Sequence, residues 1–205
     1  MTYQAVIFDL GGVVLESPFH VIQLFAKQSQ VAPEQLLQVL KYSAAGGAWA
    51  KLERGELTRE GFATAIEADG AQKGIQFSGM GLLEAFDKHI TLRPKVLEAI
   101  RGYRERGLKV AALTNNWPTT DKLQVAFESL VEEFDVFVES WKVGARKPEL
   151  PIYERVLEEL NVAPSKIVFL DDLGENLKPA RAMGITTVKV ASIDAAMREL
   201  ADLLE

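Results

Sequence analysis

Four short stretches of the sequence carry residue types that bind metal ions and phosphate. They are Asp9, then Thr114-Asn115, then Lys147, and finally the adjacent pair Asp171-Asp172. Taken singly, each has an ordinary structural explanation, because an Asp after a strand is most often a turn or cap residue. The Asp pair is the strongest sign of a site, since two like charges repel unless a cation or a shared proton compensates them.

Taken together, these residues predict phosphoryl-transfer chemistry. Three carboxylates form an oxygen-only ligand set that suits Mg²⁺, which keeps several waters and commonly shares a phosphate substrate. Lys147 would neutralise phosphate oxygens as a point charge, and the Thr114 hydroxyl with nearby backbone N–H groups would hold the remaining oxygens. Asp9 would then be free to attack phosphorus and form an aspartyl-phosphate. We therefore expect Mg²⁺ as cofactor and a small phosphorylated substrate.

This chemistry requires elements that bring the four stretches together. Short apolar runs typical of buried strands occupy residues 5–8, 110–113 and 167–170, and weaker candidates occupy 136–138 and 186–190. Runs that are apolar on both faces indicate a parallel sheet covered on both sides. In such sheets ligands bind beyond the carboxyl ends of the strands, which is where Asp9, Thr114 and Asp171 would lie.

Helical patterns alternate with these strands from residue 91 onward. We expect helices over 94–106, 148–160 and 192–204, and a helix within 176–183 with Pro179 in its first turn. The alternation predicts an α/β fold with a doubly wound parallel sheet. Residues 16–90 contain four helical apolar stripes and no convincing strand. We therefore expect an α/β core domain of residues 1–15 and 91–205 and an inserted helical cap domain of residues 16–90.

The composition restricts the classes of function. With 205 residues, 48% apolar and 25% charged, the chain resembles ordinary globular proteins and not disordered ones. A net charge of −6 argues against nucleic-acid binding, and no apolar run is long enough for a membrane helix. The absence of Cys excludes thiolate chemistry and fits a reducing compartment. We expect a cytoplasmic monomer or homodimer without nucleic-acid or membrane partners.

The four stretches resemble, in order, the motifs of the haloacid dehalogenase superfamily, most of whose members are Mg²⁺-dependent phosphatases. The similarity covers nearly the whole chain, and it implies a Rossmann-like core with a helical cap that closes over the site. Residues 143–190 are especially similar to the N-terminal phosphatase domain of soluble epoxide hydrolases, and some sugar-phosphate phosphatases share the Asp-Leu-Gly first motif. The four stretches are Phe8-Asp9-Leu10-Gly11-Gly12-Val13, Leu113-Thr114-Asn115, Arg146-Lys147-Pro148, and Phe169-Leu170-Asp171-Asp172 with Asn176.

The resemblance implies a role for each matching position. Asp9 would be the nucleophile and a metal ligand, with the Gly11 backbone carbonyl and Asp172 as further ligands. Lys147 would take part in catalysis and bind phosphate together with Thr114 and the Asn115 backbone. Asp171 would lie behind the metal ligands or reach the metal through water, and Asn176 would steady the acidic loop.

Gly11 departs from the pattern of the family's phosphatases, which normally carry Asp two residues after the nucleophile as general acid and base. Glycine cannot protonate a leaving alkoxide, and general acid catalysis is typically worth about 10²–10⁴-fold in rate. Esters with poor leaving groups should suffer most, whereas anomeric sugar phosphates, acyl phosphates and aryl phosphates need less help. Glu16 and His20 are the nearest downstream residues that could replace this acid. We expect, however, that Glu16 is a solvated hinge residue and that His20 is a residue of a cap helix.

Three hypotheses follow. The leading one is a Mg²⁺-dependent phosphomonoester hydrolase acting through an aspartyl-phosphate on a small phosphorylated metabolite, for instance a sugar phosphate. The second is a haloacid dehalogenase attacking carbon with Asp9, but that branch usually has Tyr where this chain has Gly11. The third is a non-catalytic phosphoacceptor or phospholigand-binding protein weakened by Gly11. In each case Trp117 is the aromatic residue best placed to line the substrate opening, while Trp49 and Trp141 are expected to pack.

Overall fold

Five parallel strands form the sheet at the centre of the α/β core. The computed structural model describes residues 2–120 and 127–205. The sheet order is β3-β2-β1-β4-β5, so the first strand lies in the middle and the chain winds outward on both sides. The predicted α/β fold is confirmed. The strands are β1 (Ala5–Phe8), β2 (Lys109–Thr114), β3 (Val136–Glu139), β4 (Ile167–Asp171) and β5 (Thr186–Lys189).

The central strand β1 shows why the apolar runs are continuous. Val6 and Phe8 contribute to the apolar cluster on one face of the sheet, and Ala5 and Ile7 contribute to the cluster on the other face. Successive side chains of a strand alternate between faces, so a strand covered on both sides needs apolar residues throughout. Phe8 pairs in register with Ala112 of β2 and Leu170 of β4. Asp9 and Asp171 therefore follow at the same level.

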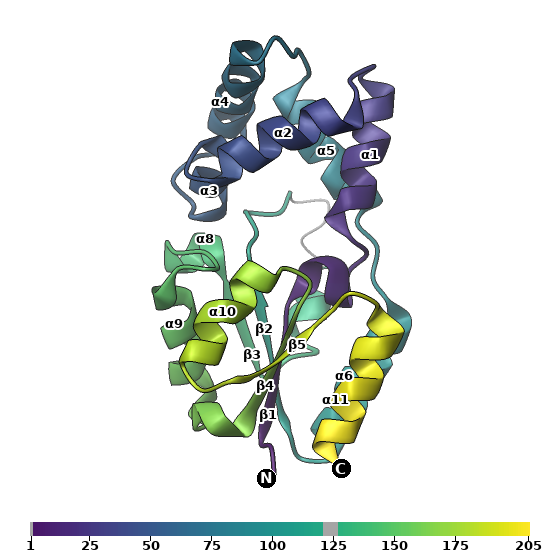
Figure 1. Cartoon of the computed structure of the whole chain (residues 1–205), viewed down its shortest axis with the longest axis vertical. Helices are drawn as coiled ribbons and strands as arrows, with labels where there is room; N and C mark the ends of the chain where they lie inside the picture. The colour runs from purple at the N-terminus through teal and green to yellow at the C-terminus, as the bar shows by residue number, and fades with distance from the viewer. Residues whose placement is uncertain (1, 121–126) are drawn as a thin grey trace.

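Two pairs of helices cover the sheet (Figure 1). One apolar cluster joins the sheet to α6 (Pro94–Glu105) and α11 (Ile193–Leu204). The opposite cluster joins it to α9 (Leu150–Leu160) and α10 (Gly174–Ala182). Short elements complete the core, namely α8 (Ser140–Val143) after β3 and the 3-10 turn η2 (Pro164–Lys166) before β4.

The position of Pro179 differs from the prediction. We expected it in the first turn of a helix, but α10 begins at Gly174, which places Pro179 in the helix interior. The helix begins early because the Leu173 backbone N–H, at its N-cap, donates to Asp171 Oδ1 at 2.7 Å. The acidic loop at the end of β4 therefore leads directly into α10.

Five helices form the cap above the carboxyl ends of the strands (Figure 1). They surround an apolar cluster of their own, which includes Phe25, Leu36, Leu52, Phe62 and Phe86. The domain boundaries expected from the sequence remain a prediction. The helices are α1 (Pro18–Gln28), α2 (Pro33–Ala44), α3 (Ala48–Glu53), α4 (Arg59–Gln72) and α5 (Gly79–His89).

Two chain crossings connect the cap to the core. A tight helical segment, η1 (Leu10–Val14), leads from β1 to Leu15, which forms an antiparallel bridge with Leu92 on the return crossing. The carboxylate of Glu16 and the guanidinium of Arg93 pair across the same crossings at 2.8 Å. The two connections are thus held together where the cap meets the core.

No helix in residues 2–120 and 127–205 combines the length and apolar character needed to cross a bilayer.

Candidate active site

Asp9 directly follows β1 and is almost fully buried. Its Oδ1 atom accepts a hydrogen bond from the Leu10 backbone N–H at 2.7 Å and another from Lys147 Nζ at 2.7 Å. Within the described part of the chain, both hydrogen bonds to this carboxylate end on Oδ1. Oδ2 is therefore the oxygen left for a ligand or a reaction.

Lys147 occupies the centre of the site and is 1% exposed. Its ammonium group donates to Asp9 Oδ1 at 2.7 Å, Asp171 Oδ2 at 2.8 Å and the Leu113 carbonyl at 2.7 Å. These three acceptors satisfy the three donors of the ammonium group. Although burial acts to lower it, the carboxylates of Asp171 and Asp9 raise the pKa of Lys147 above its ordinary value. Lys147 is therefore a permanent positive charge between the ends of β1, β2 and β4.

Asp171 is fully buried and its carboxylate is occupied by protein donors. Oδ1 accepts from the Leu173 backbone N–H, Oδ2 accepts from Lys147, and the Asn176 side-chain amide lies 3.1 Å from both oxygens. Asn176 in turn accepts at its backbone carbonyl from the Tyr153 hydroxyl at 2.7 Å. This arrangement leaves neither oxygen of Asp171 free of a protein donor.

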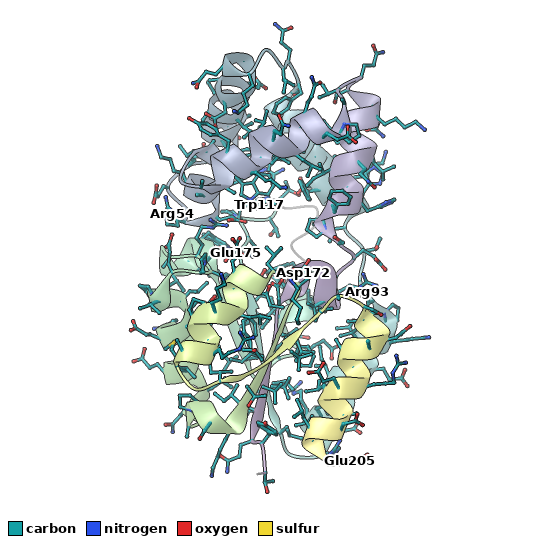
Figure 2. All side chains as sticks on the ribbon, in the orientation of Figure 1. Arg54, Arg93, Trp117, Asp172, Glu175 and Glu205 are labelled. Carbon is teal, nitrogen blue, oxygen red and sulfur yellow. The ribbon has the colours of Figure 1, made fainter. Side chains whose placement is uncertain are left out.

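Asp172 extends the acidic loop and is only partly buried, near the top of the core in Figure 2. Its carboxylate lies against Gly12, where an added Cβ atom would come 2.5 Å from Asp172 Oδ2. Gly12 also has a φ of 76°, in the left-handed region that favours glycine. The second glycine of the first motif therefore provides the space that the Asp172 carboxylate occupies.

The side chain of Asn115 holds the backbone of the loop that carries Lys147. Its Oδ1 accepts from the Lys147 N–H at 2.8 Å, and its Nδ2 donates to the Lys147 carbonyl at 3.0 Å. We had expected the backbone of Asn115 to bind phosphate, and this two-point contact of its side chain was not foreseen. The buried hydroxyl of Thr114 lies beside it at the end of β2.

Sequence reasoning also missed a network behind Asn115. Ser140 Oγ contacts both the backbone N–H and the carbonyl of Asn116, at 2.9 and 3.1 Å. Glu139 is buried and accepts from Asn116 Nδ2 and from Trp141 Nε1. The available sequence signal was the polar pair Glu139-Ser140 directly after an apolar strand candidate. The network fixes the turn that follows Thr114.

A cavity of about 350 Å³ opens between this polar cluster and the cap. The core contributes Gly11, Thr114 and Asn115 to its wall, and the cap contributes Trp49, Glu53 and Phe86. Most of the remaining wall is apolar. Its apolar residues are Leu10, Leu15, Pro18, Ile90, Leu92, Trp117, Phe127 and Leu130, and its polar residues are Glu16, Asp87, Asn116 and Thr119.

Some of the other residues singled out in the sequence line the cavity, and others do not. Trp117 lines the cavity as expected, and Trp49 lines it as well, although we had expected packing only. Figure 2 shows Trp117 between the cap and the core. Glu16 borders the cavity but is paired with Arg93, and His20 is an exposed residue of α1. Neither is placed as an evident replacement for the acid that Gly11 lacks.

The carboxylates fit a divalent cation. Carboxylate oxygens of Asp9, Asp171 and Asp172 lie within 4.8 Å of one another, although protein donors already occupy both oxygens of Asp171. That spacing is close to the roughly 4 Å that separates ligands on opposite sides of Mg²⁺. Burial raises the pKa of the Asp9 carboxyl to about 7, and burial together with the Asp171 charge raises that of Asp172 to about 6. In both carboxyl groups the effect of burial exceeds the opposing effect of the Lys147 charge.

The space beside Gly12 generates a first prediction. Gly12→Ala should weaken Mg²⁺ binding by about tenfold or more, because the new methyl group displaces the Asp172 carboxylate. Gly74→Ala is the matched control, since Gly74 has a similar φ of 71° but no atom within 4 Å of an added Cβ. Calorimetric titration with Mg²⁺ should show a loss only for Gly12→Ala, and equal affinities in the two variants would contradict this account.

The raised pKa values of Asp9 and Asp172 generate a second prediction. A carboxyl whose pKa is higher in the folded state favours folding below its unfolded pKa, and that contribution is lost as pH rises through about 6 to 7. A bound Mg²⁺ ion would offset the negative charge that then develops on these carboxylates. The Mg²⁺-induced rise in melting temperature should therefore be larger at about pH 8 than at about pH 5. A rise independent of pH, measured by thermal unfolding, would show that these carboxyls do not hold the ion.

Curated relatives match the chain along almost its whole length. It is 34% identical over 213 residues to mouse acyl-CoA dehydrogenase family member 10 and 32% identical over 214 residues to pig bifunctional epoxide hydrolase 2. The matches cover 99% and 98% of this chain but only 19% and 38% of those longer proteins. A sesquiterpene phosphatase of Aspergillus oryzae is 28% identical over 209 residues, covering 99% of this chain and 97% of its own length.

Solved structures share the fold. A haloacid dehalogenase-like hydrolase from Porphyromonas gingivalis superimposes with a TM-score of 0.73 at 22% identity, covering 98% of both chains. A haloacid dehalogenase family enzyme from Bacteroides thetaiotaomicron, solved in complex with magnesium and inorganic phosphate, gives 0.62 at 21% identity, covering 91% of this chain and 93% of its own. A model of the haloacid dehalogenase-like hydrolase family matches residues 3–184. The chain therefore belongs to the haloacid dehalogenase-like hydrolases.

Proposed function

We propose that the chain is a Mg²⁺-dependent phosphomonoester hydrolase that works through an aspartyl-phosphate on Asp9. The observation that carries this proposal is the convergence of a buried nucleophile, a buried ammonium group and an acidic loop at one end of the sheet. The cavity borders the same place, so a substrate could reach it. Phosphoryl transfer needs mainly positioning and charge neutralisation, which this arrangement provides.

The reaction would proceed in two displacements at phosphorus. Asp9 Oδ2 attacks the phosphorus atom, the bond to the ester oxygen breaks, and the leaving group departs with the electron pair. Lys147 orients the Asp9 carboxylate through Oδ1 and offsets negative charge on the phosphoryl oxygens. Water then attacks the same phosphorus and gives up a proton to solvent, from which the departed leaving group takes one; the bond to Asp9 breaks, and phosphate leaves as Asp9 regains its carboxylate. Thr114 and the backbone around Asn115 would hold the phosphoryl oxygens during both steps.

Asp9, Asp172 and the Gly11 carbonyl are the groups that would hold Mg²⁺. Asp171 would act indirectly, because protein donors already occupy both of its oxygens. When bound, the ion would supply positive charge that stabilises the phosphoryl group in the transition state. Magnesium and phosphate in the Bacteroides thetaiotaomicron relative support this part of the proposal.

The substrate would be a small phosphorylated metabolite bound under the cap, with residues 16–90 acting as the cap domain over a core of residues 1–15 and 91–205. A cavity of about 350 Å³ is sufficient for a leaving group of metabolite size. Its aliphatic and aromatic wall favours a leaving group with an apolar face over a sugar, whose hydroxyls need polar partners. The sesquiterpene phosphatase among the relatives supports the same direction. Sugar phosphates remain the second substrate class to test.

Phosphate release is the direct test of this function. The purified protein should release phosphate from p-nitrophenyl phosphate with Mg²⁺ and stop when a chelator is added. Asp9→Asn should lower kcat by roughly 10³-fold or more, because the nucleophile is lost. Asp194→Asn, at the exposed start of α11, is the control and should leave kcat unchanged.

Two other outcomes would overturn the proposal. Chloride release from haloacids in the presence of chelator would identify a dehalogenase. A phospho-Asp9 adduct that persists for hours without hydrolysis would identify a non-catalytic phosphoacceptor. A panel containing a prenyl phosphate and a hexose phosphate would separate the two substrate classes.

Gly11 generates a further prediction about leaving groups. An added Cβ at Gly11 would meet only Pro18 at 3.6 Å, and φ is −64°, so a side chain is tolerated. Gly11→Asp should therefore raise turnover of alkyl phosphates by about tenfold or more relative to p-nitrophenyl phosphate, because only the poor leaving group needs a proton. Gly11→Asn, of nearly equal size, is the control. Equal effects of the two variants on both esters would mean that proton donation does not limit the wild-type protein.

A further inference from the structure

Arg146 joins the loop of residues 144–149, which carries Lys147, to the cap. It immediately precedes Lys147, yet its side chain extends away from the sheet toward the cap. One terminal nitrogen donates to the Ala44 carbonyl at the end of α2 at 2.9 Å, and Nε lies 2.5 Å from Glu53 Oε2 at the end of α3. The side chains of Arg146 and Glu53 are 14% and 7% exposed. This is a nearly buried ion pair between the two parts of the molecule.

Glu53 connects that ion pair to the wall of the cavity. Its Oε1 accepts from Trp49 Nε1 at 2.9 Å. The Trp49 ring lies edge-on to Trp117 of the core at 5.4 Å and close to Phe86 of α5 at 5.7 Å. Glu53 and all three aromatic residues line the cavity. A leaving group in the cavity would therefore contact the residues that hold Glu53 in place.

A second contact holds the same loop from the cap. Arg54, which Figure 2 labels at the lower edge of the cap, donates to Glu149 Oε1 at 3.1 Å. The other oxygen of Glu149 accepts from the Arg146 backbone N–H at 3.1 Å. Gly55 approaches the Trp141 carbonyl so closely that an added Cβ would lie 2.6 Å from it. The end of α3 and the residues after it thus contact both the loop and the preceding helix α8.

Only one peptide bond separates Arg146, which contacts the cap, from Lys147, which contacts Asp9. Lys147 follows Arg146, its backbone is held by Asn115, and its ammonium group contacts Asp9. We propose that the Glu53–Arg146 ion pair is a positioning contact, which couples closure of the cap over a bound leaving group to the placement of Lys147 at Asp9. The proposal rests on the phosphatase function proposed above. Arg146 and Glu53 would act through Lys147 and not on the reacting atoms.

A proton-donor role for Glu53 is the competing explanation, since the carboxyl borders a cavity that lacks an acid at Gly11. Burial raises the pKa of Glu53, while Arg146 and the hydrogen bond from Trp49 oppose that shift. Both partners are donors, so they hold the carboxylate as an acceptor. Lys147 is the other charge that acts on Glu53, and it likewise favours the ionised form. The contacts therefore favour positioning over proton donation.

Kinetics with two aryl esters test the coupling. Phenyl phosphate and naphthyl phosphate have leaving groups of similar acidity but different size, so only the larger one fills the cavity. Glu53→Gln and Arg146→Gln should each lower kcat for naphthyl phosphate roughly tenfold more than for phenyl phosphate, and the double variant should be no worse than either single one. Arg146→Lys keeps the charge and should recover most of the loss. Glu133→Gln removes a remote ion pair with Arg101 and should change neither ester.

The alternatives give different results. Additive losses in the double variant, or equal losses for both esters, would overturn the coupling. A higher KM with unchanged kcat would indicate simple substrate binding. A loss in Glu53→Gln that grows with the pKa of the leaving group, at constant size, would identify Glu53 as the proton donor instead.

Hydrogen exchange provides a readout that does not depend on turnover. Backbone amides of residues 144–147 and 149 should exchange faster in Glu53→Gln and Arg146→Gln than in wild type, and Glu133→Gln should leave them unchanged. Unchanged exchange in both variants would overturn the positioning role even in an active enzyme. Faster exchange in a protein that releases no phosphate would instead reject the phosphatase function while leaving the cap-to-loop contact intact.

Discussion

One buried ammonium group determines how the site is assembled. Lys147 reaches Asp9, Asp171 and the Leu113 carbonyl from a loop that belongs to none of their strands. An unpaired buried charge is very costly, and removing one partner of a buried ion pair typically costs about 3–5 kcal/mol. The ends of β1, β2 and β4 must therefore stay at their present spacing for Lys147 to remain satisfied. The same constraint that holds the fold together at this point also aligns the candidate nucleophile.

The sheet and the polar residues at its edge could be predicted from sequence, because both follow from local patterns. Continuous apolar runs such as Ala5–Phe8 have one plausible environment, and parallel strands deliver their C-terminal residues to one edge. The positions of Asp9, Thr114 and Asp171 follow from that geometry alone. Their chemical roles do not, and they remain proposals.

The missed features depend on contacts between distant segments. The Asn115 side chain holds a backbone 32 residues away, and Arg146 meets a carbonyl 102 residues away. No periodicity in the sequence indicates such pairs, because their partners lie in segments that only the folded chain brings together. Pro179 was misplaced for a related reason, since the start of α10 is set by Asp171 and not by the proline.

Gly11 and the cap together give the site its particular character. The core would supply the proposed nucleophile and positive charge, but Gly11, two residues after Asp9, has no side chain that could act as an acid. The cap adds an apolar cavity wall and a buried Glu53, which is paired with Arg146 and accepts a hydrogen bond from Trp49. Such a site suits leaving groups that depart without a proton and that are recognised by shape. Substrate selection would then lie in the cap, and chemistry in the core.

A crystal structure with Mg²⁺ and beryllium fluoride, a mimic of a phosphoryl group on a carboxylate, tests the central claim most directly. The account predicts the mimic bonded to Asp9 Oδ2, the metal ion held by Asp9, Asp172 and the Gly11 carbonyl, and Lys147 still donating to Asp9 Oδ1. A mimic bonded to a different carboxylate, or a metal ion bound away from Asp9 and Asp172, would contradict it.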